Sequence, residues 1–110
     1  YRMEKGKMKF RIVQLHSASD VKTHGSGFCV TVQAQETVTL QADEVGVLLG
    51  KRTHHRQGAF FPGGLLNPGW SGVPSIEMLI FGQLEVKKGD EIAHAVIFQG
   101  ENVEGYIFNE

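Results

Sequence analysis

The sequence has little cysteine and no long apolar run. Cys29 is the only cysteine among 110 residues, so no disulfide can form within the chain. No apolar stretch approaches the roughly 20 residues that a membrane-spanning helix needs. No apolar signal-peptide core follows the polar start over residues 1–5. These absences predict a soluble, cytoplasmic protein without a membrane partner.

An excess of charge of either sign is also missing. The formal net charge is −1, from 11 Lys and Arg against 12 Asp and Glu. Such a balance removes the whole-molecule attraction that nucleic acid or an anionic surface would need. The hydrophobic share of 41% and the charged share of 21% are ordinary for a soluble globular chain. We predict a single domain over residues 1–110, since this length suits one hydrophobic core.

Helical periodicity is scarce. The chain is interrupted by 14 glycines and 3 prolines, and no window keeps apolar residues three and four apart for several turns. Apolar residues alternate with polar ones instead, most clearly over residues 28–34. The pattern predicts an all-β sandwich or barrel. Its expected strands cover residues 9–15, 28–34, 38–40, 45–49, 76–81, 84–86 and 91–98.

Two local patterns add detail to these strands. Residues 87–90 read Lys-Lys-Gly-Asp, which predicts a tight turn and a hairpin between the strands on either side. Lys5, Lys7, Lys9 and Arg11 stand at period 2 and would share one face of a strand. We interpret them as the solvated face of an edge strand that lysines protect from aggregation. A phosphate-facing surface is the alternative.

The segment 46–53 resembles a phosphate-binding loop but lacks two of its parts. The loop needs four residues between its glycines and Ser or Thr directly after Lys. Here three residues separate the glycines, and Arg52 follows Lys51. We reject this motif.

Metal and thiol chemistry are weakly supported. His54 and His55 are adjacent, and adjacent residues of an extended chain point to opposite sides, so they are poor joint ligands. A metal-binding cupin barrel would require a His-x-His pair, which does not occur. We therefore predict no metal site. Cys29 has no CxxC partner and no evident activating base, so we interpret it as a small packed residue.

The most specific pattern lies over residues 64–94. Residues 64–72 read Gly-Leu-Leu-Asn-Pro-Gly-Trp-Ser-Gly, a strand follows, and residues 88–94 read Lys-Gly-Asp-Glu-Ile-Ala-His. The order resembles the trimeric dUTPase and dCTP deaminase superfamily, where Gly-x-Ile-Asp-Pro-Gly-Phe-x-Gly precedes Pro-Gly-Asp/Met-x-Ile-Ala-Gln. The deaminase form is the more similar one. This resemblance implies a dUTPase-like distorted jelly roll, or β-clip barrel, assembled as a homotrimer.

The resemblance also implies catalytic residues. Glu77 matches the deaminase glutamate that activates water for attack on cytosine C4 without metal. Arg56 matches the arginine that holds phosphate or the network of water and base. Glu77 shares its strand face with Leu79 and Phe81, so we expect burial to disfavour its ionised form. The alternative is a glutamate that ends a strand or pairs with a surface lysine.

A nucleotide-binding set follows from the same resemblance. Residues 51–58 are similar to the Arg-Ser-Ser-Leu-Ala-Arg-x-Gly element, which grips phosphates with cations and N–H donors. The implied ligand is a deoxynucleotide such as dCTP or dUTP, no other cofactor is expected, and Mg²⁺ would enter only with the nucleotide. The implied contacts are Lys51, Arg52, Thr53, Gly58, Asn67, Trp70, Gly72 and His94.

Three departures from the family pattern keep the function open. Asn67 replaces the aspartate that supports the deoxyribose, and His94 replaces a glutamine. Residues 25–30 lack both acids of the dUTPase Asp-Ala-Gly-Tyr-Asp-Leu element, one of which dUTP hydrolysis needs. The preferred hypothesis is a pyrimidine deoxynucleotide-binding protein which, if active, deaminates dCTP to dUTP without metal. One alternative is a catalytically silent binding or assembly module, and another is a cupin-like small-molecule-binding barrel.

Overall fold

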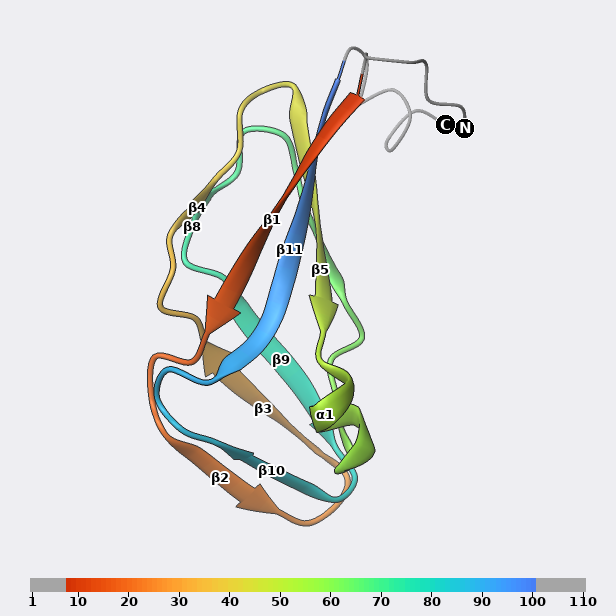
Figure 1. The fold of residues 1–110 in the computed structure, drawn as a ribbon. Helices are drawn as coiled ribbons and strands as arrows, with labels where there is room; N and C mark the ends of the chain where they lie inside the picture. The colour runs from red at the N-terminus through yellow and green to blue at the C-terminus, as the bar shows by residue number, and fades with distance from the viewer. Residues whose placement is uncertain (1–7, 101–110) are drawn as a thin grey trace.

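The computed structural model describes residues 8–100, which form antiparallel sheets with one short helix (Figure 1). One sheet has the strand order β1-β11-β5-β7 and another the order β3-β9-β6, while β10 pairs with β2 and β4 with β8. The all-β prediction is confirmed. The elements are β1 (Met8–His16), β2 (Val21–His24), β3 (Phe28–Gln33), β4 (Val38–Thr39), β5 (Glu44–Gly50), α1 (Arg52–Arg56), β6 (Ala59–Phe60), β7 (Gly64–Leu66), β8 (Ser71–Gly72), β9 (Ser75–Ile80), β10 (Gln83–Val86) and β11 (Glu91–Gly100).

A single cluster of buried apolar side chains joins the sheets. Strand β9 shows why, because its exposed residues Ser75, Glu77 and Leu79 alternate with fully buried partners. Alternation at period 2 places every second side chain on the core face of a strand. The core members with no exposed surface are Leu15, Val32, Ala59, Ile76, Ile80, Leu84, Ile92, Ala93 and Ala95. Within residues 8–100, no helix is long and apolar enough to cross a membrane.

The predicted hairpin at residues 87–90 is wrong, although the turn itself is present. The Asp90 N–H donates to the Lys87 carbonyl at 2.9 Å, and Gly89 takes a φ of +92°. However, β10 pairs with β2, while β11 pairs with β1 and β5. The turn sequence dictates a local reversal but not the partners of the strands beside it. This turn carries the chain from one sheet to another.

Strand β1 lies at the edge of the four-stranded sheet, as the alternating cations suggested. Lys5 and Lys7 lie outside the described residues. Arg11 Nε lies 3.4 Å from Glu44 Oε2, and Arg11 also donates to the Thr39 carbonyl at 3.1 Å. Arg11 therefore pairs with the buried carboxylate of Glu44 instead of remaining a free surface charge.

The expectation that Cys29 is packed is wrong, because its side chain is exposed. Cys29 lies opposite Leu79 in the register of β3 and β9. It therefore belongs to the outer face of this sheet, opposite to the face that carries Val32 into the core. A small apolar residue in a strand pattern does not by itself reveal which face is covered.

Glu36 fastens the end of β1 to the loop after β3. One carboxylate oxygen accepts the His16 backbone N–H at 2.8 Å, and the other lies 2.6 Å from His16 Nδ1. Partial burial alone would raise the pKa of the Glu36 carboxyl, but the hydrogen bonds from His16 outweigh this effect and lower it. A lowered pKa in the folded state means that stability is present above the ordinary glutamate pKa of about 4.3 and is lost as the pH falls through the folded value.

We expect Glu36→Gln to remove this part of the acid sensitivity. Urea unfolding between about pH 3 and pH 6 should show a flatter loss of stability in the variant, with a difference of no more than about 1 kcal/mol because the pair is partly in water. Asp43→Asn, which removes an exposed acid elsewhere, should leave the wild-type slope unchanged. Parallel curves for wild type and Glu36→Gln would contradict the assignment.

Candidate functional site

Glu77 lies on the outer face of the β3-β9-β6 sheet. Its partner in the β3 register is Thr31, and the next residue on this face, Leu79, is flanked by Cys29 and Phe60. The exposed fractions are 38% for Leu79 and 42% for Phe60, and Glu77 is itself exposed. The face is apolar on the Leu79 side of the carboxylate, as predicted, but polar on the other side, where Thr31 and Ser75 lie. The predicted burial of Glu77 is not met within one chain, because no element of residues 8–100 covers this side chain.

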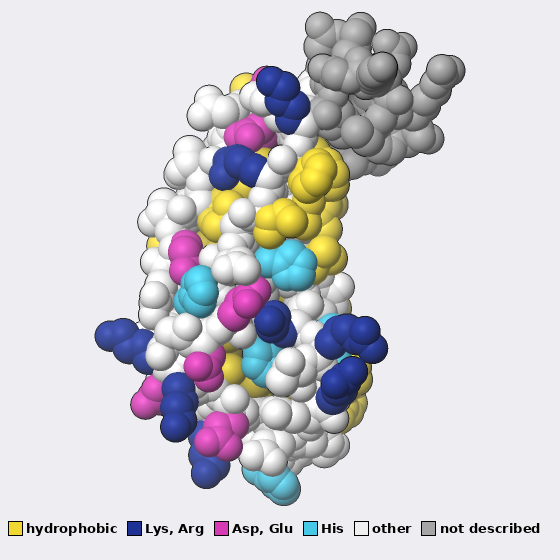
Figure 2. Space-filling view, in the orientation of Figure 1, with side chains coloured by type: hydrophobic (Ala, Val, Ile, Leu, Met, Phe, Trp, Pro, Cys, Tyr) yellow, Lys and Arg dark blue, Asp and Glu magenta, His cyan; other side chains and the backbone are white. Residues whose placement is uncertain are grey.

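Helix α1 contacts the outer face of this sheet through His55. The His55 ring stacks on Phe60 at 5.3 Å between centroids, and Phe60 meets Phe81 edge-on at 6.0 Å. Arg52 and Arg56 are exposed. Figure 2 shows basic and histidine side chains together over the part of the surface where α1 lies.

The two predicted catalytic residues do not meet within the described chain. Arg56 precedes β6, which pairs with the Leu79–Ile80 end of β9. Glu77 lies three residues back from Ile80, a strand length of roughly 10 Å. No hydrogen bond or ion pair joins Glu77 to Arg56 within residues 8–100. Any site that uses both groups needs a ligand or a second chain between them.

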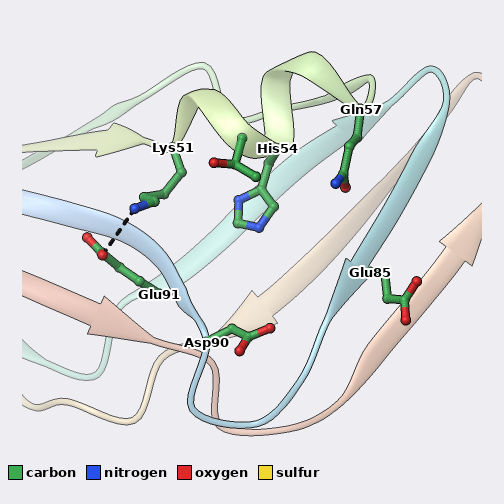
Figure 3. A pocket seen from close by; sticks show the side chains of 7 residues that line it. Lys51, His54, Gln57, Glu85, Asp90 and Glu91 are labelled. Carbon is green, nitrogen blue, oxygen red and sulfur yellow. Dashed lines mark hydrogen bonds and ion pairs between the residues drawn. The ribbon is translucent and has the colours of Figure 1, made fainter.

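A hollow of about 270 Å³ lies between α1 and the start of β11 (Figure 3). Two of the predicted nucleotide contacts, Lys51 and Thr53, line it. Lys51 Nζ already lies 3.1 Å from Glu91 Oε2. A phosphate would have to compete with this carboxylate for Lys51. The other lining residues are His54, Gln57, Glu85 and Asp90.

His54 was considered from the sequence only with His55, as a poor pair of metal ligands on an extended chain, but both residues lie on helix α1. The residue surface of His54 is only 7% exposed, and Nδ1 is buried without a hydrogen-bond partner in the described chain. Burial lowers the pKa of the imidazole, and the positive charge of Lys51 lowers it further. The ring is therefore neutral near pH 7. Among residues 8–100, no three His, Cys, Asp or Glu side chains are arranged to hold a metal ion.

Four of the other predicted contacts lie in two separate places, the turn before β8 and strand β11. Asn67 is exposed and its carbonyl accepts the Trp70 N–H at 3.0 Å, which forms a turn between β7 and β8. Trp70 packs partly into the core, and a Cβ at Gly72 would lie 3.3 Å from its ring. His94 lies on β11 between Gln14 and Leu49.

Gly58 has a role within the chain. It takes a φ of +90°, and a Cβ there would lie 2.8 Å from the Gly82 nitrogen. Its close approach is therefore to another backbone segment. The structure brings together Lys51 with Thr53, and Asn67 with Trp70 and Gly72, but does not gather the whole predicted set in one chain.

Comparison with known proteins supports the all-β architecture described above. No family model and no curated protein sequence matches the chain. Its sheets with one helical turn are similar to a solved structure described as native EIAV dUTPase, with a TM-score of 0.64 over 86% of this chain and 89% of that one. The identity is 15%. The chain therefore has the dUTPase fold.

Proposed function

We propose that this protein binds a pyrimidine deoxynucleotide, dCTP or dUTP, at a site completed between copies of the chain in a homotrimer. The observation that carries the proposal is the exposed position of Glu77 beside an apolar patch on the outer sheet face of a dUTPase-type fold. Leu79, Phe60 and Phe81 form this patch on one side of Glu77 and are 38%, 42% and 60% exposed. Adjacent exposed apolar side chains of this kind mark interaction sites.

A second exposed apolar face supports a cyclic assembly. Phe10, Ile12, Leu49 and Leu65 are 65%, 57%, 42% and 56% exposed on strands of the β1-β11-β5-β7 sheet. Figure 2 shows hydrophobic side chains gathered over the part of the surface where these strands lie. Two different contact surfaces on one chain are what a closed ring of identical subunits uses.

The chemistry that this arrangement would support is metal-free deamination. Once a neighbouring copy and the base cover Glu77, its carboxylate can take a proton from water as the oxygen attacks C4 of cytosine. The exocyclic amine then accepts the proton and leaves as ammonia, which converts dCTP to dUTP. The exposed guanidinium groups of Arg52 and Arg56 are suited to the phosphates, since they carry bidentate donors.

A catalytically silent binding or assembly module is the second candidate. It is favoured by the ion pair between Lys51 and Glu91 and by the separation of Arg56 from Glu77 within one chain. We also propose a cytoplasmic location for either form, because the exposed thiol of Cys29 suits a reducing compartment.

The test is to incubate the purified protein with dCTP and with dUTP, each with and without Mg²⁺, and to follow products by chromatography. Light scattering on the same sample gives the mass. We expect a trimer that converts dCTP to dUTP without Mg²⁺. Release of dUMP from dUTP would instead indicate a diphosphatase. A trimer that binds either nucleotide without turnover would favour the silent module, and a monomer that binds neither would overturn both proposals.

A further inference from the structure

The hollow beneath α1 carries more negative than positive charge. Three carboxylates line it, those of Glu85, Asp90 and Glu91, against the single ammonium of Lys51. Lys51 and Glu91 neutralise each other at 3.1 Å. Glu85 and Asp90 are in no ion pair with any residue that the structure describes. Lys22 lies opposite Glu85 in the register of β10 and β2, and Asp90 Oδ2 accepts the Lys87 N–H at 2.9 Å. The hollow therefore holds two carboxylates that have no ion-pair partner within residues 8–100.

His54 gives a second and independent indication of a ligand. Its side chain is more than nine-tenths buried, and Figure 3 shows its ring extending from α1 into the space between Lys51 and Gln57, facing Asp90. Its Nδ1 is buried without a hydrogen-bond partner in the described chain. A buried polar group without a partner is destabilising, and a neutral imidazole offers one acceptor nitrogen.

The chemistry of the lining excludes two common ligand classes. A phosphate would face the carboxylates of Glu85 and Asp90, and like charges at short range repel. A metal ion would need several converging ligands, and no suitable group of His, Cys, Asp or Glu exists among residues 8–100. An organic ammonium ion needs only acceptors at hydrogen-bond distance, which carboxylates and a neutral imidazole supply.

We infer that this hollow binds a small organic amine in its ammonium form. Glu85 and Asp90 hold the positive charge, His54 accepts one N–H, and Thr53 and Gln57 complete the polar lining. A water molecule occupies about 30 Å³ in the liquid. The hollow of about 270 Å³ is therefore much larger than a bare ammonium ion and has space for a short carbon chain. A linear diamine meets both requirements, since it carries ammonium groups and has a short carbon chain.

The experiment is a calorimetric titration of the full chain with 1,4-diaminobutane at low ionic strength. We expect saturable binding by the wild type and binding about tenfold weaker in Glu85→Gln, because a charge-assisted contact is replaced by a neutral one. Glu85 is exposed, so this variant should fold. His54→Leu, followed by nuclear magnetic resonance, should also weaken binding. Asp43→Asn removes one exposed charge at a distant turn and should bind as the wild type does.

Several results would overturn the inference. The neutral analogue 1,4-butanediol should not bind, and equal binding would show that the charge is irrelevant. An equal loss in Asp43→Asn and Glu85→Gln would show that only net charge matters. Displacement of the diamine by equimolar Mg²⁺, or tighter binding of inorganic phosphate at the same residues, would assign the hollow to a different ligand class.

Discussion

Replacing Gly82 with alanine is expected to destabilise the protein by about 3 kcal/mol, a large part of the 5–15 kcal/mol typical of a domain. A Cβ at Gly82 would lie 2.5 Å from the Gln57 carbonyl oxygen, which no side chain tolerates. The same oxygen accepts the Gln83 N–H at 2.9 Å, and the Gly58 carbonyl accepts the Phe81 N–H at 2.7 Å. The substitution must therefore separate α1 from the turn after β9, which adds the loss of hydrogen bonds to the steric cost.

Urea unfolding followed by circular dichroism measures this effect, and Gly64→Ala is its matched control. Gly64 also lacks a positive φ, but a Cβ there would lie 3.6 Å from the nearest atom, an ordinary contact. Its alanine variant should remain within about 0.5 kcal/mol of the wild type. Equal midpoints for the two variants would mean that α1 does not approach the turn as closely as described.

Glu77→Gln is expected to reduce the conversion of dCTP to dUTP by a factor of about 100 to 10,000, the usual contribution of a positioned general base. The amide keeps the size of the side chain but cannot take the proton from water. Because Glu77 is exposed on β9, the variant should stay within about 0.5 kcal/mol of wild-type stability. The measurement is single-turnover conversion of dCTP with the assembled protein, alongside its mass and unfolding midpoint.

Asp43→Asn is the matched control for this variant, since it removes one exposed carboxylate from a turn remote in sequence from β9. It should keep full turnover. A Glu77→Gln protein that folds, assembles and still deaminates dCTP would remove Glu77 from the mechanism. Nucleotide binding that persists in this variant would be consistent with its predicted role as a base.

Most strands could be predicted from the sequence because their faces differ in polarity. Strand β9 illustrates this, since the alternation over residues 75–80 matches its exposed and buried sides. Which strands pair was harder to predict from the sequence, because a turn such as residues 87–90 encodes a chain reversal but not the partner of either strand. Strand β10 instead pairs with β2, more than 50 residues earlier in the chain. The short strands β6, β7 and β8 have too few residues to show a period.

The candidate site was predictable only where it depends on local sequence. The position of Glu77 on an apolar face followed from alternation, but its exposure depends on what covers the face. His54 lines a hollow together with Asp90 of the β10–β11 turn, a residue 36 positions further along the chain. Gly82 gave no signal at all, because its requirement for glycine comes from the backbone of Gln57 and Gly58.

The central position of β11 has a consequence for synthesis. This strand lies between β1 and β5, and Met8 pairs with Gly100 across nearly the whole described chain. A nascent chain translated only as far as residue 90 would lack the strand that joins the two, and contacts between distant segments form slowly. The four-stranded sheet can therefore form only after β11 has emerged from the ribosome. Until then β1 has no partner in this sheet and one edge of β5 is unpaired, and unpaired strand edges can pair with other chains.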